Sequence, residues 1–210
     1  IGNDFAKYWG LDIDDYKASV EALINRRLRK VDVGSCSYFD GNAHQVRYFL
    51  NAVYIGLGAR IVMITNETRR FWGFRSISYL ASLFLMIFER KLHRMHLKLN
   101  DEHIRGRIMT VCIGSAKGYG LTPSAVPYNG WLDVSVIYRP ELLQLVSGLW
   151  MLQHNRLLNH KTVKSYRTRK VQLLRAQNSE VSLDGRLLLD KHYPLEVRIL
   201  PEAVTLIIPE

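Results

Sequence analysis

The stretch KVDVGSCSYFDGNAHQVRYFLNAVYIGL, residues 30 to 57, combines two runs rich in β-branched and aromatic residues with a turn signal between them. Val, Ile, Tyr and Phe favour extended backbone because their side chains fit the pleated surface of a sheet. Asp40-Gly41-Asn42 separates the two runs and is typical of a tight turn. We therefore predict a β-hairpin with strands over 30–39 and 45–57.

The rest of the chain continues this β-rich pattern. Leu195, Val197 and Ile199 alternate with polar residues, as in a strand that buries one face. Asp184-Gly185 predicts a second hairpin turn. Further strands are expected over 94–99, 104–115, 131–138, 163–174, 195–200 and 204–208, and helices over 13–29, 76–90 and 140–154, with a short helix after Asp4. The predicted fold class is α+β and β-rich, an antiparallel two-sheet sandwich with a few flanking helices.

Basic residues outnumber acidic ones by 29 to 19, which gives a formal net charge of +10. Residues 142–179 hold seven cations and no acid, so the excess is concentrated in that stretch. Three interpretations stay open, namely binding of phosphate or anionic lipid, binding of nucleic acid, or a solvated face. A strand over 163–174 would divide its cations between two faces, and no nucleic-acid recognition motif accompanies them. We therefore expect no nucleic-acid partner.

Several other features narrow the protein class. Cys36 and Cys112 lie in apolar, strand-like contexts, which favours buried thiols over a disulfide framework. His93 and His96 have no third ligand nearby in the sequence, so we interpret them as surface residues rather than zinc ligands. The longest apolar run, over 79–88, has ten residues, whereas a membrane-spanning helix needs about 20. We expect a soluble or peripheral protein.

Three short motifs are candidates for a functional site, although each also has a purely structural interpretation. Gly2-Asn3-Asp4 can cap a helix, Asp184-Gly185 can form only a turn, and Asp32 can be a solvent-facing strand residue. The Gly- and Pro-rich segment over 115–130 contains 16 residues. A loop of that length inside a compact domain is usually functional.

The order of the motifs is more specific than any one of them. The stretches are GNDFAKYWGL (2–11), KVDVGSCSYFDGN (30–42) with RYFLNAVYIGLGARI (47–61), VCIGSAKGYGLTPSAVPYNGWLDVSVI (111–137), and VSLDGRLLL (181–189) with YPLEVRILPEAVTLIIP (193–209). In that order they resemble the C-terminal half of the bacterial diacylglycerol kinase-like lipid kinases, which are related to sphingosine kinases and more distantly to NAD kinases. The resemblance implies that residues 1–210 form the C-terminal lipid-kinase domain. It also implies that the N-terminal nucleotide-binding domain, with its Gly-Gly-Asp-Gly-Thr loop, is absent from this chain.

The resemblance also implies a set of site residues. Gly2, Asn3 and Asp4 match the motif that lines the nucleotide and metal end of the cleft between the two domains. Asp4 is the residue that we most expect to be catalytic, and Asp184 is the second. Phosphoryl transfer needs groups that hold a cation and orient the attacking hydroxyl, which carboxylates can do.

Two positions depart from the family pattern. Asp32 matches an aspartate of a Mg²⁺-water network, but Asn129 stands where its acidic partner is expected, and it offers a neutral oxygen. Arg186 stands where the family has a glutamate that is a leading candidate for the catalytic base. A guanidinium cannot accept a proton. Asp190 is a candidate substitute for that base.

The expected function is therefore transfer of the ATP γ-phosphate to a lipid hydroxyl, with diacylglycerol favoured and this chain supplying the lipid side of the cleft. The alternative is a non-catalytic lipid-binding or regulatory member, suggested by Arg186 and Asn129. Expected cofactors are ATP and Mg²⁺. Expected partners are the lipid substrate, a peripheral membrane surface, the N-terminal nucleotide-binding domain and, as an open alternative, a second copy of the chain. The expected location is the cytoplasm, with peripheral attachment at the inner face of the membrane as an open alternative.

Overall fold

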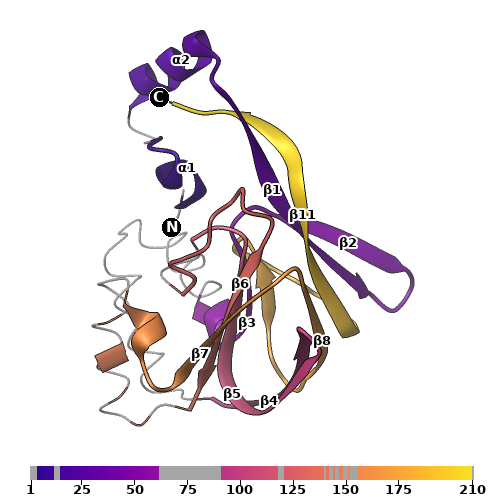
Figure 1. The fold of residues 1–210 in the computed structure, drawn as a ribbon. Helices are drawn as coiled ribbons and strands as arrows, with labels where there is room; N and C mark the ends of the chain where they lie inside the picture. The colour runs from indigo at the N-terminus through magenta and orange to yellow at the C-terminus, as the bar shows by residue number, and fades with distance from the viewer. Residues whose placement is uncertain are drawn as a thin grey trace, which may run out of the picture.

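The computed structural model describes residues 4–11, 15–61, 91–117, 121–139, 141, 144, 147–148, 151 and 156–209 (Figure 1). The helices are α1 (Asp4–Tyr8), α2 (Tyr16–Asn25) and the 3-10 turn η1 (Leu157–Asn159). The strands are β1 (Leu28–Phe39), β2 (His44–Phe49), β3 (Ala52–Gly56), β4 (His93–Leu99), β5 (Glu102–Gly114), β6 (Leu132–Tyr138), β7 (Val163–Thr168), β8 (Lys170–Ala176), β9 (Val181–Leu183), β10 (Arg186–Leu187) and β11 (His192–Ile207). The helix expected over 76–90 lies outside the described residues, as does most of the one expected over 140–154.

These strands join in one antiparallel hydrogen-bonded network of eleven strands. Its main order is β10-β9-β3-β5-β4-β8-β11-β1-β2, and β6 joins it by pairing with β5 and β7. Long strands make this continuity, because β5 pairs with β4 along its first half and with both β3 and β6 along its second half. The β-rich class with few helices is confirmed, and the sheet curls (Figure 1). The predicted division into two separate sheets is not confirmed, since the described strands stay connected around the curl.

The core fills the inside of this curl. Strand β4 shows the pattern clearly, because alternate residues from His93 to Leu99 are buried and those between them are not. Leucine, isoleucine and valine side chains from most strands meet in one cluster, among them Leu97, Ile108, Ile113, Leu132, Leu173 and Leu195. Cys36 and Cys112 are both fully buried free thiols, as predicted, and burial raises the pKa of each to about 12.

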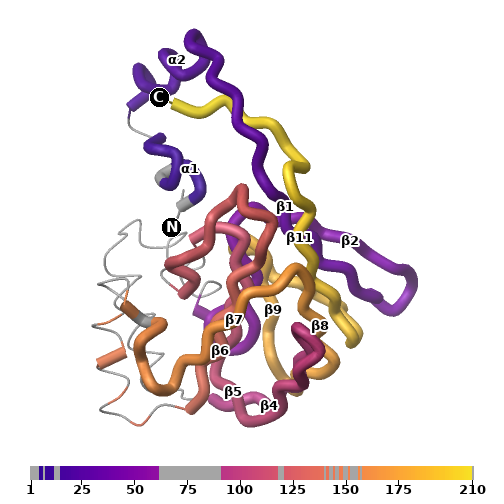
Figure 2. The backbone as a smooth tube through the Cα atoms, viewed as in Figure 1, coloured from indigo at the N-terminus to yellow at the C-terminus, as the bar shows by residue number. Residues whose placement is uncertain are grey.

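An arm projects from the sheet where the start of β1 pairs with the end of β11 and leads to α2 (Figure 2). The helix predicted over 13–29 is wrong at its end: Arg26 adopts a left-handed conformation that terminates α2, and Leu28 already belongs to β1. The apolar stripe of α2 stays exposed, with Leu23 at 57% and Ile24 at 71% exposure.

Bulges and corners adjust strands that the sequence predicted as regular. The strand expected over 163–174 is two strands, because Thr168 Oγ1 accepts from Lys170 N and turns the chain at Arg169. The strand expected over 45–57 divides into β2 and β3. Conversely, the strands expected over 195–200 and 204–208 are one strand, β11, interrupted only by a bulge.

The surface interpretation of His93 is wrong, because its side chain is buried and its Nδ1 lies 3.3 Å from the Gln177 carbonyl. Within the described part of the chain, no cluster of three or more His, Cys, Asp or Glu groups could hold a metal ion. No helix of that part is long and apolar enough to cross a bilayer.

Candidate functional site

Asp184 holds the turn between β2 and β3 with its carboxylate. The residue sits in the β9–β10 hairpin in a left-handed conformation, with φ of 45°. Its Oδ2 accepts from Leu50 N at 2.7 Å, and its Oδ1 accepts from Asn51 N at 2.9 Å and Ala52 N at 3.0 Å. Three consecutive amides thus converge on one carboxylate. A carboxylate has about four acceptor sites, and these three amides of the described residues occupy three of them.

Asp32 plays a similar part at the other side of the sheet. It lies at a bulge where the β1–β11 register shifts, and only 1% of its surface is exposed. Its Oδ2 accepts from Gly130 N at 2.6 Å, and its Oδ1 accepts from Glu202 N at 2.9 Å. Buried backbone amides need such acceptors, because an unsatisfied one costs about 1–3 kcal/mol. Asp32 is therefore not the solvent-facing residue that its strand context allowed.

The segment 115–130 is fastened near both ends, directly by Asp32 and indirectly by Asp184. At its start, Ser115 N and Ala116 N both donate to the carbonyl of Asn51, in the turn that Asp184 holds. At its end, Gly130 N donates to Asp32. The described parts of this segment form a loop, as predicted, whose conformation depends on two carboxylates that lie far from it in the sequence.

Helix α1 docks against the same loop. The Tyr8 and Tyr128 hydroxyls are 3.3 Å apart, the Trp9 and Tyr128 rings lie 5.7 Å apart, and the Arg29 guanidinium lies 4.1 Å from the centre of the Tyr128 ring. Burial and then the hydrogen bond with Tyr128 raise the pKa of Tyr8 to about 12. Asp4 begins α1, so its backbone belongs to this assembly.

Three predicted site groups are not placed by the structure. Gly2 and Asn3 lie outside the described residues, and so does the side chain of Asp4. Their roles at a nucleotide stay predictions.

The predicted metal ligands Asp32 and Asn129 lie on either side of one backbone contact, since Asp32 binds the amide of the residue after Asn129. The Oδ1 of Asn129 accepts from Trp131 N at 2.9 Å within its own turn. In this geometry both side chains accept hydrogen bonds from backbone amides. Because Mg²⁺ usually takes one or two carboxylates and keeps several waters, their role as its ligands stays a prediction.

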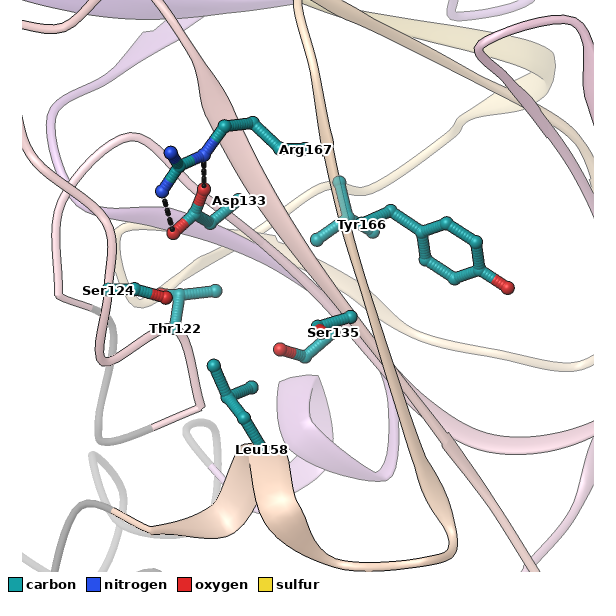
Figure 3. A pocket seen from close by; sticks show the side chains of 9 residues that line it. Thr122, Ser124, Asp133, Ser135, Leu158, Tyr166 and Arg167 are labelled. Atoms are coloured by element: carbon teal, nitrogen blue, oxygen red, sulfur yellow. Dashed lines mark hydrogen bonds and ion pairs between the residues drawn. The ribbon is translucent and has the colours of Figure 1, made fainter.

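A polar pocket of about 300 Å³ opens between the loop and strands β6 and β7 (Figure 3). At its rim Asp133 and Arg167 form a two-point ion pair, with Nε–Oδ1 at 2.8 Å and Nη2–Oδ2 at 3.4 Å. The hydrogen bond and charge of Asp133 raise the pKa of Arg167. The remaining polar lining consists of hydroxyl groups from Thr122, Ser124, Ser135 and Ser165, whereas the Tyr166 hydroxyl points away from the pocket (Figure 3).

Sequence reasoning missed Asp133 as a site residue. The signal was present, because a carboxylate directly before the apolar run of β6 must be buried with that strand and so needs a partner. What the sequence could not supply is the partner, Arg167, 34 residues further along the chain.

Arg186 lines a second pocket of about 530 Å³. Asp190, Arg47 and Asp40 line the same pocket. Backbone amides of Ala43 and Asn42 hold the pKa of Asp40 below its ordinary value. Asp190, the candidate substitute base, therefore shares a pocket with the arginine that occupies the family's base position.

Comparisons with known proteins identify the family and the fold. The YegS C-terminal NAD kinase beta sandwich-like domain matches residues 51–208. A "Probable lipid kinase YegS-like" protein of Pseudomonas syringae pathovar tomato is 28% identical over 190 residues, which covers 87% of this chain and 57% of the relative. A protein of the same name from Pseudomonas savastanoi pathovar phaseolicola is 28% identical over 203 residues, 93% of this chain and 61% of the relative.

Solved structures share the fold at low identity. A diacylglycerol kinase from Bacillus anthracis superimposes with a TM-score of 0.61 at 14% identity, covering 98% of this chain and 63% of that one. Another Bacillus anthracis crystal structure gives a TM-score of 0.71 at 16% identity, with coverages of 98% and 66%. The chain spans about three fifths of the length of the curated relatives it matches.

Proposed function

The chain belongs to the family of the YegS C-terminal NAD kinase beta sandwich-like domain, and from that premise we propose that it is the lipid-side domain of an ATP-dependent lipid kinase. In this proposal residues 1–210 form one domain of the kinase, and a nucleotide-binding domain precedes them. The names of the Pseudomonas relatives support a lipid kinase. Diacylglycerol is our favoured acceptor.

The observation that carries the proposal is the fastening of loop 115–130 by Asp184 and Asp32. Phosphoryl transfer depends mainly on positioning and on neutralising charge, because the protein forms few covalent bonds to the phosphoryl group. Mg²⁺-ATP supplies the phosphoryl group when it is bound. The contribution of this chain is to hold the acceptor lipid, and a loop fixed at both ends by carboxylates is suited to do so.

The polar pocket of Figure 3 is the proposed place for the hydroxyl-bearing end of the lipid. Its hydroxyl groups can both donate and accept hydrogen bonds, which matches a glycerol-like headgroup. The ion pair of Asp133 and Arg167 forms the rim of this pocket. The fourth acceptor site of the Asp184 carboxylate is the proposed contact for the acceptor hydroxyl. Asp190, which lines the pocket of Arg186, is the second candidate for the base.

The second candidate function is lipid binding without catalysis. Arg186 carries it, because this exposed cation lines the pocket where the family's base is expected and cannot remove a proton. This candidate predicts that the protein binds lipid without turning over ATP.

The test uses protein made from the full reading frame that contains these residues. The protein is incubated with labelled ATP, Mg²⁺ and mixed lipid micelles, and phosphorylated lipid is separated by chromatography. We expect a product that is lost in Asp4→Asn and Asp184→Asn. Asp101→Asn is the matched control, because the Asp101 side chain is fully exposed in the β4–β5 turn.

The outcome separates the two candidates. A product that persists in Asp184→Asn contradicts the role given to that residue. No product from a protein that still binds lipid supports the non-catalytic candidate and makes Arg186→Glu the next variant. Residues 1–210 alone should give no product, since the proposed nucleotide-binding domain is missing from them.

A further inference from the structure

Basic residues gather on strands β4, β5 and β8, which pair side by side in the sheet (Figure 1). They line a pocket of about 550 Å³. The pocket is lined by Arg94, Met95, His96, Arg105, Gly106, Arg107, Arg175 and Gln177. Four of these eight residues are arginines, and none is acidic.

The strand register sets these cations directly opposite one another. Arg94 pairs with Arg107 between β4 and β5, and His96 pairs with Arg105. Side chains in such positions have Cβ atoms about 5 Å apart, and like charges there destabilise a sheet. Among the described residues, no carboxylate forms an ion pair with any of the four arginines.

A β-bulge turns Arg175 toward this pocket. Buried Leu173 pairs with Leu97, and Arg175, two residues later, pairs with His96, so Leu174 is the extra residue. If the strand were regular with Leu174 in place, strict alternation after Leu173 would point Arg175 into the core. The bulge instead buries Ala176 and brings a fourth arginine to the pocket. Bulges often re-aim a side chain at functional positions.

The contacts of His96 show the same excess of positive charge. Arg105 Nε donates to His96 Nε2 at 3.1 Å, and because an arginine nitrogen can only donate, this His96 nitrogen carries no proton. His103 Nδ1 lies 2.8 Å from the same nitrogen. Desolvation, Arg105 and His103 together lower the pKa of His96. Burial and the neighbouring cations thus disfavour the charged form of His96.

We propose that this pocket binds a phosphate group, either free or as the headgroup of an anionic lipid. Arginine presents a planar fork of donors that matches phosphate oxygens, and several arginines around one cavity can bind such a dianion through paired hydrogen bonds. A bound phosphate would offset the repulsion between the opposed cations. The site is separate from the proposed kinase chemistry, and its test does not depend on it.

The test measures binding of inorganic phosphate to the chain by calorimetry and by thermal unfolding, against sodium chloride at equal ionic strength. Phosphate should raise the melting temperature more than chloride does. Arg107→Gln and Arg175→Gln should each weaken phosphate binding about tenfold, the effect of losing one charge-assisted hydrogen bond. Both variants should fold, because each relieves repulsion. Arg27→Gln, which changes an exposed arginine between α2 and β1, is the matched control and should bind as the wild type does.

The second arm of the test distinguishes the sources of the phosphate. Co-sedimentation with phosphatidylcholine vesicles containing phosphatidic acid, lost in Arg107→Gln and reversed by free phosphate, identifies a lipid headgroup. Binding of phosphate without co-sedimentation identifies a soluble ligand. Equal effects of phosphate and chloride, or equal binding by the wild type, Arg107→Gln and Arg175→Gln, would overturn the proposal.

Discussion

The two ends of strand β8 carry similar charges in opposite surroundings. At the first end, Lys170 Nζ lies 2.8 Å from Glu196, and in the adjoining β7 Arg167 lies 2.8 Å from Asp133. At the last end, Arg175 faces His96 and shares a pocket with three more arginines. The first end is neutralised by its neighbouring strands, whereas the second is not. We infer that a basic side chain is available to bind a ligand only where the strand register places no acidic residue beside it.

Removing the acid at the neutralised end should have the largest effect. Asp133→Ala leaves Arg167 without its two-point partner and removes a buried carboxylate that organises the rim of the polar pocket. We expect the free energy of unfolding to fall by about 2 kcal/mol, the cost of an orphaned charged hydrogen bond on a half-exposed side chain. Urea unfolding measures it, with Asp101→Asn as the control, because asparagine tolerates the left-handed conformation of that residue. A loss no larger than that of the control would mean that this end is no more neutralised than the other.

Glu196→Gln should have a smaller effect, and one that depends on pH. Burial alone would raise the pKa of Glu196, but hydrogen bonds from Lys170, Arg198 and Gln172 outweigh it and lower the pKa to about 2. Because the unfolded chain binds this proton more readily, the stabilisation is present above about pH 4.5 and is lost as the pH falls toward about 2. We expect wild type and variant to differ by about 1 kcal/mol near neutral pH.

Acid titration of both proteins, followed by urea unfolding at each pH, checks this difference. The two stability curves should converge as the pH falls through that window. Curves that stay parallel would show that Glu196 does not neutralise the first end of β8.

At the other end, removing a cation should stabilise rather than destabilise. Arg107→Gln eliminates the repulsion with Arg94 directly across the sheet. We expect a gain of about 0.5 kcal/mol at low ionic strength, and none in concentrated salt, where the charges are screened. Thermal melts of wild type and variant across a salt series measure it. A loss of stability at low salt would reveal an acidic partner and contradict the comparison.

The smallest expected effect concerns His96. Its pKa lies below the ordinary value in the folded protein, so the unfolded chain binds a proton first as the pH falls. Its contribution to stability is therefore complete above about pH 6.5 and is lost below that value. His96→Asn should flatten the stability profile of the wild type in this window. An unchanged profile, or a histidine NMR titration at the ordinary pKa, would show that the arginines do not act on His96.

Local features of the fold were predictable from the sequence, and features that depend on distant pairing were not. The turn at Asp40-Gly41-Asn42 and the alternation in 195–199 predicted strands correctly, because turn chemistry and period-two burial act between near neighbours. The bulges at Asp32 and Leu174 could not be predicted, since each is defined by the register with a strand far away in the sequence.

The same distinction between local and distant interactions applies to the candidate site. Family resemblance selected Asp32 and Asp184, but the amides that they hold lie between 98 and 170 residues away in the sequence. The count of charged residues identified 142–179 as the most basic stretch. In the structure, however, Arg167 and Lys170 of that stretch form ion pairs with acidic residues. Three of the four pocket arginines lie outside that stretch, in a part of the chain whose total charge is nearly balanced.

The bulge in β8 has an evolutionary consequence. Deletion of the single codon for Leu174 would place Arg175 directly after buried Leu173, so strict alternation would still point Arg175 outward, opposite His96. A relative could therefore keep this pocket with a strand that is one residue shorter and has no bulge. A gap at Leu174 in an alignment would then not mark the loss of the pocket, whereas replacement of one of its arginines would.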